Sequence, residues 1–149
     1  MSYPIYHSSI TTFSGKFRWL SNFYASPVVY KGLAFPTVEN AYQAAKTDNE
    51  TFRRKLTTCS PGLAKRYGAS FIQPDGFERV SIMRLLLEQK FKPWSELAIR
   101  LEQTGDCLIV EGNDWMDTFW GQCPVGNGLN MLGSLIMEIR RKNRLNNET

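Results

Sequence analysis

Apolar residues recur at helical spacing over most of the chain after residue 37. Boundary signals accompany the pattern: Thr37 and Ser60 are hydroxyl residues suited to capping, Pro61 suits a first helical position, and Gly68 suits a helix end. The predicted helices are residues 37 to about 48, 60–68, 77–91, 94–103 and about 130–143, with Pro93 between the third and the fourth. We therefore expect a mainly helical protein.

Two stretches carry β-type residues instead. Residues 13–35 are aromatic and β-branched with turn residues between them, which predicts short paired strands around Pro27–Tyr30. Residues 107–110, Cys-Leu-Ile-Val, follow a Thr-Gly-Asp turn and predict another strand, whereas the polar ending RLNNET is expected to fray. The expected fold is α+β, a mainly α-helical single domain over residues 1–149 around a small, mostly antiparallel sheet, with its core at about 13–142 and mobile termini.

Composition narrows the possible chemistry. The chain has 149 residues, 42% of them apolar, which suits one hydrophobic core. Its formal net charge of +4 favours a polyanionic ligand. The only histidine, His7, lies near the N-terminus, which argues against a catalytic triad with a histidine base and against a histidine-rich metal site.

The cysteines and the hydropathy pattern indicate the compartment. Cys59, Cys107 and Cys123 are odd in number and widely spaced, so they predict neither a disulfide framework nor a zinc site and fit a reduced, intracellular protein. No segment approaches the roughly 18 apolar residues of a membrane span, and the first residues lack the pattern of a leader. We expect a soluble cytoplasmic protein that does not bind membranes.

The first predicted helix carries a polar stripe beside its apolar face. At about 100° per residue, Glu39, Gln43 and Lys46 lie within about 60° of one another. One interpretation is a solvated edge, with Glu39 in the first turn complementing the helix dipole. The other is a cleft wall bearing a carboxylate, an amide and an amine, which suits chemistry at an electrophilic sugar carbon.

Two further clusters have both a functional and an ordinary interpretation. In residues 111–121, Asp114 and Asp117 alternate with large rings such as Trp120, which suits sugar or ring binding as well as turns and core anchors. Glycine-rich residues 126–130 precede the last helix, where they could bind a phosphate or form an ordinary turn. Dispersed basic runs, including Lys90 with Lys92 and the run 140–144, are either solvated faces or a rim facing nucleic acid.

In chain order these segments resemble the NADAR (YbiA-like) family. The resemblance rests on at least five separated motifs across about residues 13–142: Leu20-Ser-Asn-Phe23, Gly32-x-x-Phe-Pro-Thr-Val-Glu39-Asn-Ala-Tyr-Gln43-Ala-Ala-Lys46, Lys90-Phe91, Thr104-Gly105, Asp117-x-x-Trp120-Gly121 and Asn130-x-Leu-Gly133 with Met137-Glu-Ile-Arg140 behind it. This sequence departs from the family where Gln122-Cys123-Pro124 replaces an acidic residue and glycines, and where Phe77 stands at a position often held by tryptophan.

The resemblance implies an N-glycosidase that cleaves a ribose C1–nitrogen bond without a metal or a redox cofactor. It implies two substrate classes: ADP-ribose on guanine in DNA or RNA, our first expectation, and phosphoribosylamine intermediates of riboflavin synthesis. A non-catalytic ADP-ribose-binding module is a further alternative, because the departure at residues 122–124 could have cost turnover. Pairing with an ADP-ribosyltransferase toxin is a possible partnership, and the sequence leaves the oligomeric state open.

Site roles follow from the same resemblance. As the C1–nitrogen bond breaks, positive charge develops on the sugar, so Glu39 is expected to act as an anionic stabiliser or base. Asp117 would orient water or hold ribose hydroxyls, and Lys46 would be either a Schiff-base nucleophile or a phosphate ligand. The expected substrate-binding residues are Asn22, Phe23, Gln43, Trp120 and Gly121 for base and ribose, and Arg84, Lys90, Gly126 and Asn130 for phosphate.

Overall fold

The computed structural model describes residues 8–147, so His7 and the extreme ends of the chain lie outside the described residues. The chain forms two compact units. The central unit is Leu20–Lys92, and the terminal unit combines the segment up to Trp19 with the chain from Pro93 onward.

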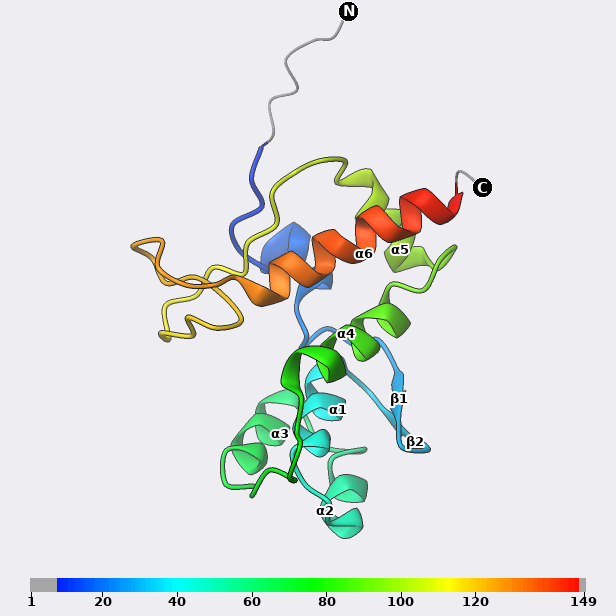
Figure 1. Ribbon diagram of the computed structural model, residues 1–149, viewed down its shortest axis with the longest axis vertical. Coiled ribbons are helices and arrows are strands. Elements are labelled where there is room, and N and C mark those ends of the chain that lie inside the picture. The colour runs from blue at the N-terminus through cyan, green and yellow to red at the C-terminus, as the bar shows by residue number, and fades with distance from the viewer. Residues whose placement is uncertain (1–7, 148–149) are drawn as a thin grey trace, which may run out of the picture. The chain divides into compact units, whose positions relative to one another are not determined.

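Helix α1 (Val38–Ala45) lies at the centre of the central unit. All of its residues are buried, and it packs against α3 (Pro61–Gly68), α4 (Arg79–Lys90) and a β-hairpin (Figure 1). The Thr37 hydroxyl accepts a hydrogen bond from the Asn40 N–H at 3.0 Å, which confirms the predicted N-cap. The helix ends at Ala45 rather than near Asp48, so Lys46 is the residue that closes it.

The hairpin consists of β1 (Val28–Tyr30) and β2 (Leu33–Phe35), which are antiparallel and confirm the predicted strands. Its two-residue turn is Lys31-Gly32, where both φ angles are positive, at 47° and 78°, as in the tight turns that match strand twist. At the edge of β1, the Gln89 side chain accepts from the Val29 N–H at 2.7 Å and donates to the Val29 carbonyl at 2.8 Å. The hairpin is thereby tied to α4.

Helix α2 (Glu50–Lys55) was not predicted, because none of its residues is buried and it has no apolar stripe. Its Asn49 cap accepts from the Phe52 N–H. From this helix, the Arg53 guanidinium donates to the Thr47 carbonyl at 2.7 Å and to the Ala44 carbonyl at 3.4 Å. These bonds attach α2 to the carbonyl groups at the end of α1.

The terminal unit is built on α5 (Glu96–Gln103) and α6 (Met131–Asn147), which pack together. A 3₁₀ helix, Gly15–Leu20, occupies part of the region expected to be strand-like. Helix α6 continues through most of the ending that was expected to fray, and Arg144 in this ending pairs with Glu102 and Asp106. The predictions for the extreme termini fall on residues outside the described part of the chain.

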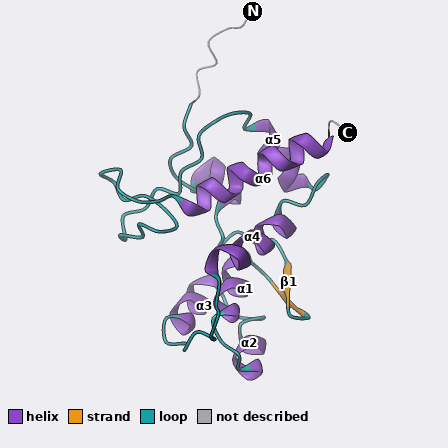
Figure 2. Ribbon diagram, in the orientation of Figure 1, coloured by secondary structure: helices purple, strands orange, loops and turns teal. Residues whose placement is uncertain are grey.

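Residues 104–130 connect α5 to α6 with little regular structure (Figure 2). The strand predicted at residues 107–110 is wrong: only a parallel bridge between Ile10 and Ile109 forms there. The Ile10 backbone donates to the Leu108 carbonyl and accepts from the Val110 N–H, both at 2.8 Å. Because the N-terminal segment forms a β-bridge with residues 107–110 through Ile10 alone, no strand ladder develops there.

The architecture confirms the predicted α+β class, with helices dominant around a small antiparallel sheet. Helix caps and the hairpin turn set most element boundaries locally. Across residues 8–147, no helix combines the length and apolar character needed to span a bilayer.

Candidate active site

Glu39 is buried in the first turn of α1, with only 8% of its surface exposed. Its Oε1 accepts a hydrogen bond from the Gln43 side-chain N–H at 2.7 Å. The interpretation of this stripe as a solvated edge is therefore wrong. A carboxylate in the first turn of a helix interacts favourably with the helix dipole, and here α1 holds this carboxyl group buried at a fixed position within the central unit.

Gln43 is positioned by a close approach of α3. Its side chain is 4% exposed, and its Oε1 has no hydrogen-bond partner among the described residues. A Cβ on Gly68 would overlap this Oε1. We predicted Gly68 as a helix end, and α3 does end there, but the absence of a side chain at this position serves a second purpose: it makes room for the Gln43 amide.

Asn22 joins this cluster from the loop before the hairpin. Its backbone carbonyl accepts from the Glu39 N–H at 3.0 Å, and its side chain is 8% exposed. The Asn22 Oδ1, like the Gln43 Oε1, has no hydrogen-bond partner in the described chain. Both oxygens are shielded from solvent. The segments that position the Glu39 carboxylate thus carry two buried acceptors without a donor. The neighbouring Phe23 ring is 41% exposed.

Lys90 fastens the loop that carries Asn22. The side chain is 3% exposed, and its Nζ donates to the Ser21 carbonyl at 2.7 Å. The ring centroids of Phe91 and Tyr24 lie 5.2 and 5.9 Å from Nζ. Burial lowers the pKa of Lys90 to about 7. The expected phosphate contact does not fit this buried, hydrogen-bonded amine, and the geometry indicates a positioning role instead.

Lys46 and Arg84 are two further expected site residues in the central unit. Lys46 closes α1 as its C-cap, is half-buried, and has its Nζ 5.2 Å from the centroid of the Tyr42 ring. Arg84 is half-buried in α4. Their expected roles as nucleophile or phosphate ligand stay predictions.

A second cluster of expected site residues lies in the terminal unit. Asp117 Oδ1 accepts from the backbone N–H groups of Phe119 and Trp120 at 3.2 and 2.9 Å. Such bonds are typical of a carboxylate that stabilises a turn, so the second oxygen of Asp117 is the one left for a substrate. The Trp120 ring packs edge-on against Phe119, with centroids 4.7 Å apart.

Glu111 and Asn113 organise this loop and were not among the predicted site residues. Asn113 Nδ2 donates to Glu111 Oε2 at 3.2 Å and to the Asp117 carbonyl at 3.0 Å. A Cβ on Gly121 would overlap the Glu111 carboxylate and backbone. Gly121 thus allows close packing of the loop, a role that the sequence analysis did not predict.

The turn before α6 does not offer the phosphate site that its glycines suggested. The N–H groups of Asn130, Met131 and Leu132 donate to carbonyls of residues 119–121 at 3.0–3.2 Å. The Asn130 side chain donates to the Ile109 carbonyl and accepts from the Glu111 N–H, both at 2.9 Å. These groups are occupied, which corrects the expected role of Asn130. Gly126, with φ at 83°, forms an open turn.

The structure thus groups the predicted residues into two clusters, one in each unit. The central unit holds Glu39 and Gln43 with Asn22 above the first turn of α1, and the terminal unit holds Asp117, Trp120 and Gly121. In residues 8–147, no three His, Cys, Asp or Glu side chains are grouped so that they could hold a metal ion.

Comparison with known proteins defines the class of this chain. The family model of the NADAR domain matches residues 11–144. The chain is 35% identical over 127 residues to proteins named N-glycosidase YbiA from Shigella flexneri serotype 5b and Escherichia coli strain K12, covering 82% of this chain and 79% of those proteins. The chain belongs to the NADAR domain family.

Two further relatives place the family in context. A protein of Vibrio vulnificus named a riboflavin biosynthesis protein is 31% identical over 130 residues, 83% of this chain but only 35% of that protein. The solution structure of Escherichia coli YbiA matches with a TM-score of 0.80 at 31% identity, over 97% of this chain and 92% of that chain. The match includes residues of both units, and the chain therefore has the fold of YbiA.

Proposed function

We propose that this protein is an N-glycosidase that hydrolyses a ribose C1–nitrogen bond, with Glu39 as its catalytic carboxylate. The observation that carries the proposal is the burial of Glu39 at the start of α1, with its Oε1 held by Gln43 at 2.7 Å. The names of the N-glycosidase relatives support the type of bond.

The chemistry follows from charge. As the C1–nitrogen bond breaks, its electron pair leaves with the nitrogen, and positive charge spreads over C1 and the ring oxygen. A preoriented carboxylate stabilises that charge, and water then adds to C1 and loses a proton. The Gln43 N–H fixes the carboxylate before the substrate binds. Asn22 holds the first turn of α1, because its backbone carbonyl accepts from the Glu39 N–H.

Lys46 completes the proposed catalytic set of the central unit. Lys46 directly follows α1, where its amine either attacks the opened sugar as a Schiff-base nucleophile or binds phosphate. In the terminal unit, Asp117 stays a predicted site residue, expected to hold a ribose hydroxyl or to orient water through the oxygen that does not bind the backbone.

The first candidate substrate is ADP-ribose attached to guanine in DNA or RNA. The net charge of +4 supports a polyanionic substrate. With this substrate, the protein would act in the cytoplasm. It would remove a modification that an ADP-ribosyltransferase toxin attaches. The second candidate is a phosphoribosylamine of riboflavin synthesis, which the name of the Vibrio vulnificus relative favours. Both candidates present the same bond.

The test uses one substitution and one matched control. The full-length protein, Glu39→Gln and Glu50→Gln are each incubated with a guanine-ADP-ribosylated oligonucleotide and, separately, with the phosphoribosylamine. Glu50 is an exposed first-turn carboxylate of α2, so it controls for the loss of one charge. Released ADP-ribose or ribose phosphate is measured by mass spectrometry, and circular dichroism verifies folding.

We expect Glu39→Gln to fold, because its amide oxygen can still accept from Gln43, and to lose at least about 100-fold in turnover. Glu50→Gln should match the unsubstituted protein. Normal turnover by Glu39→Gln would refute the assigned mechanism. Tight ADP-ribose binding without turnover of either substrate would instead identify a binding module.

A further inference from the structure

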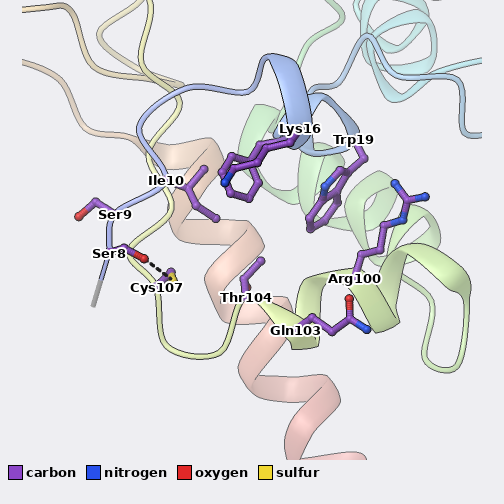
Figure 3. Close-up of a pocket in the computed structure, with 10 residues that line it drawn as sticks. Ser8, Ser9, Ile10, Lys16, Trp19, Arg100, Gln103, Thr104 and Cys107 are labelled. Carbon is purple, nitrogen blue, oxygen red and sulfur yellow. Dashed lines mark hydrogen bonds between the residues drawn. The ribbon is translucent and has the colours of Figure 1, made fainter. Parts of the chain in front are cut away.

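A cavity in the terminal unit lies outside the two clusters described above. It has a volume of about 570 Å³ and is lined by ten residues from the N-terminal segment, the 3₁₀ helix, α5 and the loop that follows α5 (Figure 3). This volume lies within the range of small-molecule sites, about 300–1,000 Å³. None of its lining residues belongs to the proposed glycosidase site.

The charged groups of the cavity are cations. Lys16 and Arg100 line it, and none of its ten lining residues is acidic. Arg100 pairs with Glu96 at 3.0 Å, in an exposed contact on one helix face. Ion pairs between exposed side chains are weak, so an anionic ligand can compete for the guanidinium.

Carboxylates beside the cavity are already engaged. Arg144 donates to Glu102 Oε1 at 3.1 Å and to Asp106 Oδ1 at 2.9 Å. In the sequence, Glu102 directly precedes the lining residue Gln103, and Asp106 directly precedes the lining residue Cys107. Their pairing with Arg144 reduces the repulsion that they would exert on an anion in the cavity.

A buried arginine fixes one wall. Arg140, 7% exposed, donates to the Thr104 hydroxyl and to the Cys107 carbonyl, both at 2.9 Å. Two residues of the lining are therefore held from behind by a cation. Ligand sites need such support, because a preorganised wall lowers the entropy lost on binding.

The remaining walls are apolar and aromatic. Ile10, Phe17 and the largely buried Trp19 contribute them, and in Figure 3 Trp19 lies between Lys16 and Arg100. Hydroxyl and amide groups of Ser8, Ser9 and Gln103 lie at the rim. A flat ring against the apolar wall, with a negative charge beside a cation, matches this arrangement.

We propose that this cavity is a nucleotide-binding site, in which the base contacts the aromatic wall and phosphate binds one of the two cations, Lys16 or Arg100, which lie on opposite sides of Trp19. The ligand is a free mononucleotide or one nucleotide of a single strand, which share this chemistry. The proposal does not depend on the glycosidase reaction, because it rests on residues of the terminal unit alone.

A thiol in the lining provides a site-specific readout. Cys107 is half-buried in the cavity, whereas Cys59 is half-buried in the central unit. The rate of alkylation of each thiol by iodoacetamide is followed by fragment-ion mass spectrometry on the full chain. The probes are adenosine monophosphate, a short single-stranded oligonucleotide and inorganic phosphate.

We expect adenosine monophosphate or the oligonucleotide to slow alkylation of Cys107 several-fold and to leave Cys59 unchanged. Protection by the mononucleotide indicates the free ligand as the source, and protection by the oligonucleotide alone indicates a strand. A Cys107 rate unaffected by both, at concentrations up to the millimolar range, would overturn the proposal.

Matched substitutions test the role of the two cations. Lys16→Gln/Arg100→Gln should raise the concentration needed for protection about tenfold or more, through loss of charge-assisted hydrogen bonds. Lys92→Gln/Arg141→Gln removes the same charge from exposed residues outside the cavity and should leave protection intact. Equal protection in both double variants would refute phosphate binding by the cations. Glycosidase activity plays no part in this readout, so the two proposals fail separately.

Discussion

A residue without a side chain determines where the proposed catalytic carboxylate is held. Gly68 leaves room for the Gln43 amide, whose N–H binds Glu39. Gly62 lies in the same helix with nothing near the position of its Cβ. The two glycines therefore separate the effect of packing from the effect of helix propensity.

Gly68→Ala is expected to displace the Gln43 amide and destabilise the fold by about 1–3 kcal/mol, as other overpacked sites do. Turnover should fall as well, although the substituted residue touches only Gln43. Gly62→Ala should be neutral or stabilising by up to about 1 kcal/mol. Urea denaturation and initial rates measure both effects, and equal behaviour of the two variants would contradict the packing argument.

Lys90 links the stability of the central unit to pH. Burial lowers its pKa in the folded protein from 10.5 to about 7. Below pH of about 7 the amine is charged in both folded and unfolded chains. Between about pH 7 and 10 only the unfolded chain keeps the proton, so the free energy of unfolding rises with pH over this window.

Lys90→Met should abolish that rise. The difference in unfolding free energy between the unsubstituted protein and this variant is expected to grow in favour of lysine from about pH 7 to 9.5. Lys92→Met, at the exposed neighbouring position, should show the same pH dependence as the unsubstituted protein. The measurement is chemical denaturation at several pH values. If the free energy of unfolding of Lys90→Met depended on pH in the same way as that of the unsubstituted protein, the linkage would be refuted.

At the scale of elements, the loop before α6 depends on one asparagine. Asn130 has φ at +48°, and its side chain binds the backbone on both sides of residue 110. The carbonyls of residues 119–121 accept from the first N–H groups of α6. The loop and the helix are therefore expected to lose order together.

Asn130→Ala should cost about 2–4 kcal/mol, because it leaves two buried backbone groups unsatisfied and places alanine at positive φ. Asn127→Ala is the control, since Asn127 is exposed and only its backbone carbonyl is bonded, to Cys123. Thermal unfolding and hydrogen exchange of residues 109–111 report the outcome. A loss below about 0.5 kcal/mol would contradict it.

Elements with local signals could be predicted from sequence, and those that depend on distant partners could not. Thr37, Ser60 and Pro61 set the starts of α1 and α3 through contacts within one turn. Helix α2 buries no residue, so it leaves no periodic pattern. The run at 107–110 has strand composition, but its strand status depended on a partner that Ile10 supplies at only one position.

The candidate site divides in the same way. Glu39 and Gln43 could be paired in advance, because one helix sets their spacing. The burial of Lys90 and the meeting of Asn22 with Glu39 depend on packing between segments far apart in sequence. The phosphate site predicted at Asn130 failed for a related reason. A helix N-terminus binds an anion only when its N–H groups have no other acceptor, and here the carbonyls of residues 119–121 accept from them.

At the scale of the whole molecule, the net charge of +4 makes the salt dependence of the rate a way to distinguish the two candidate substrates. Contacts with several phosphates of a nucleic acid release counterions, so kcat/KM on a modified oligonucleotide should fall about tenfold or more between 50 and 200 mM salt. A small phosphoribosylamine should show a much weaker dependence. Measuring both substrates in parallel tests this, and a salt-insensitive rate on the oligonucleotide would count against recognition of its strand.

The Gln89 amide also has a consequence for self-association. A two-stranded hairpin has unpaired edges through which other chains can add, a common origin of aggregation. By occupying both backbone groups of Val29, one glutamine acts there in place of a neighbouring strand. A single side chain of α4 thus occupies part of the edge of this small sheet, where another strand would otherwise have to bond.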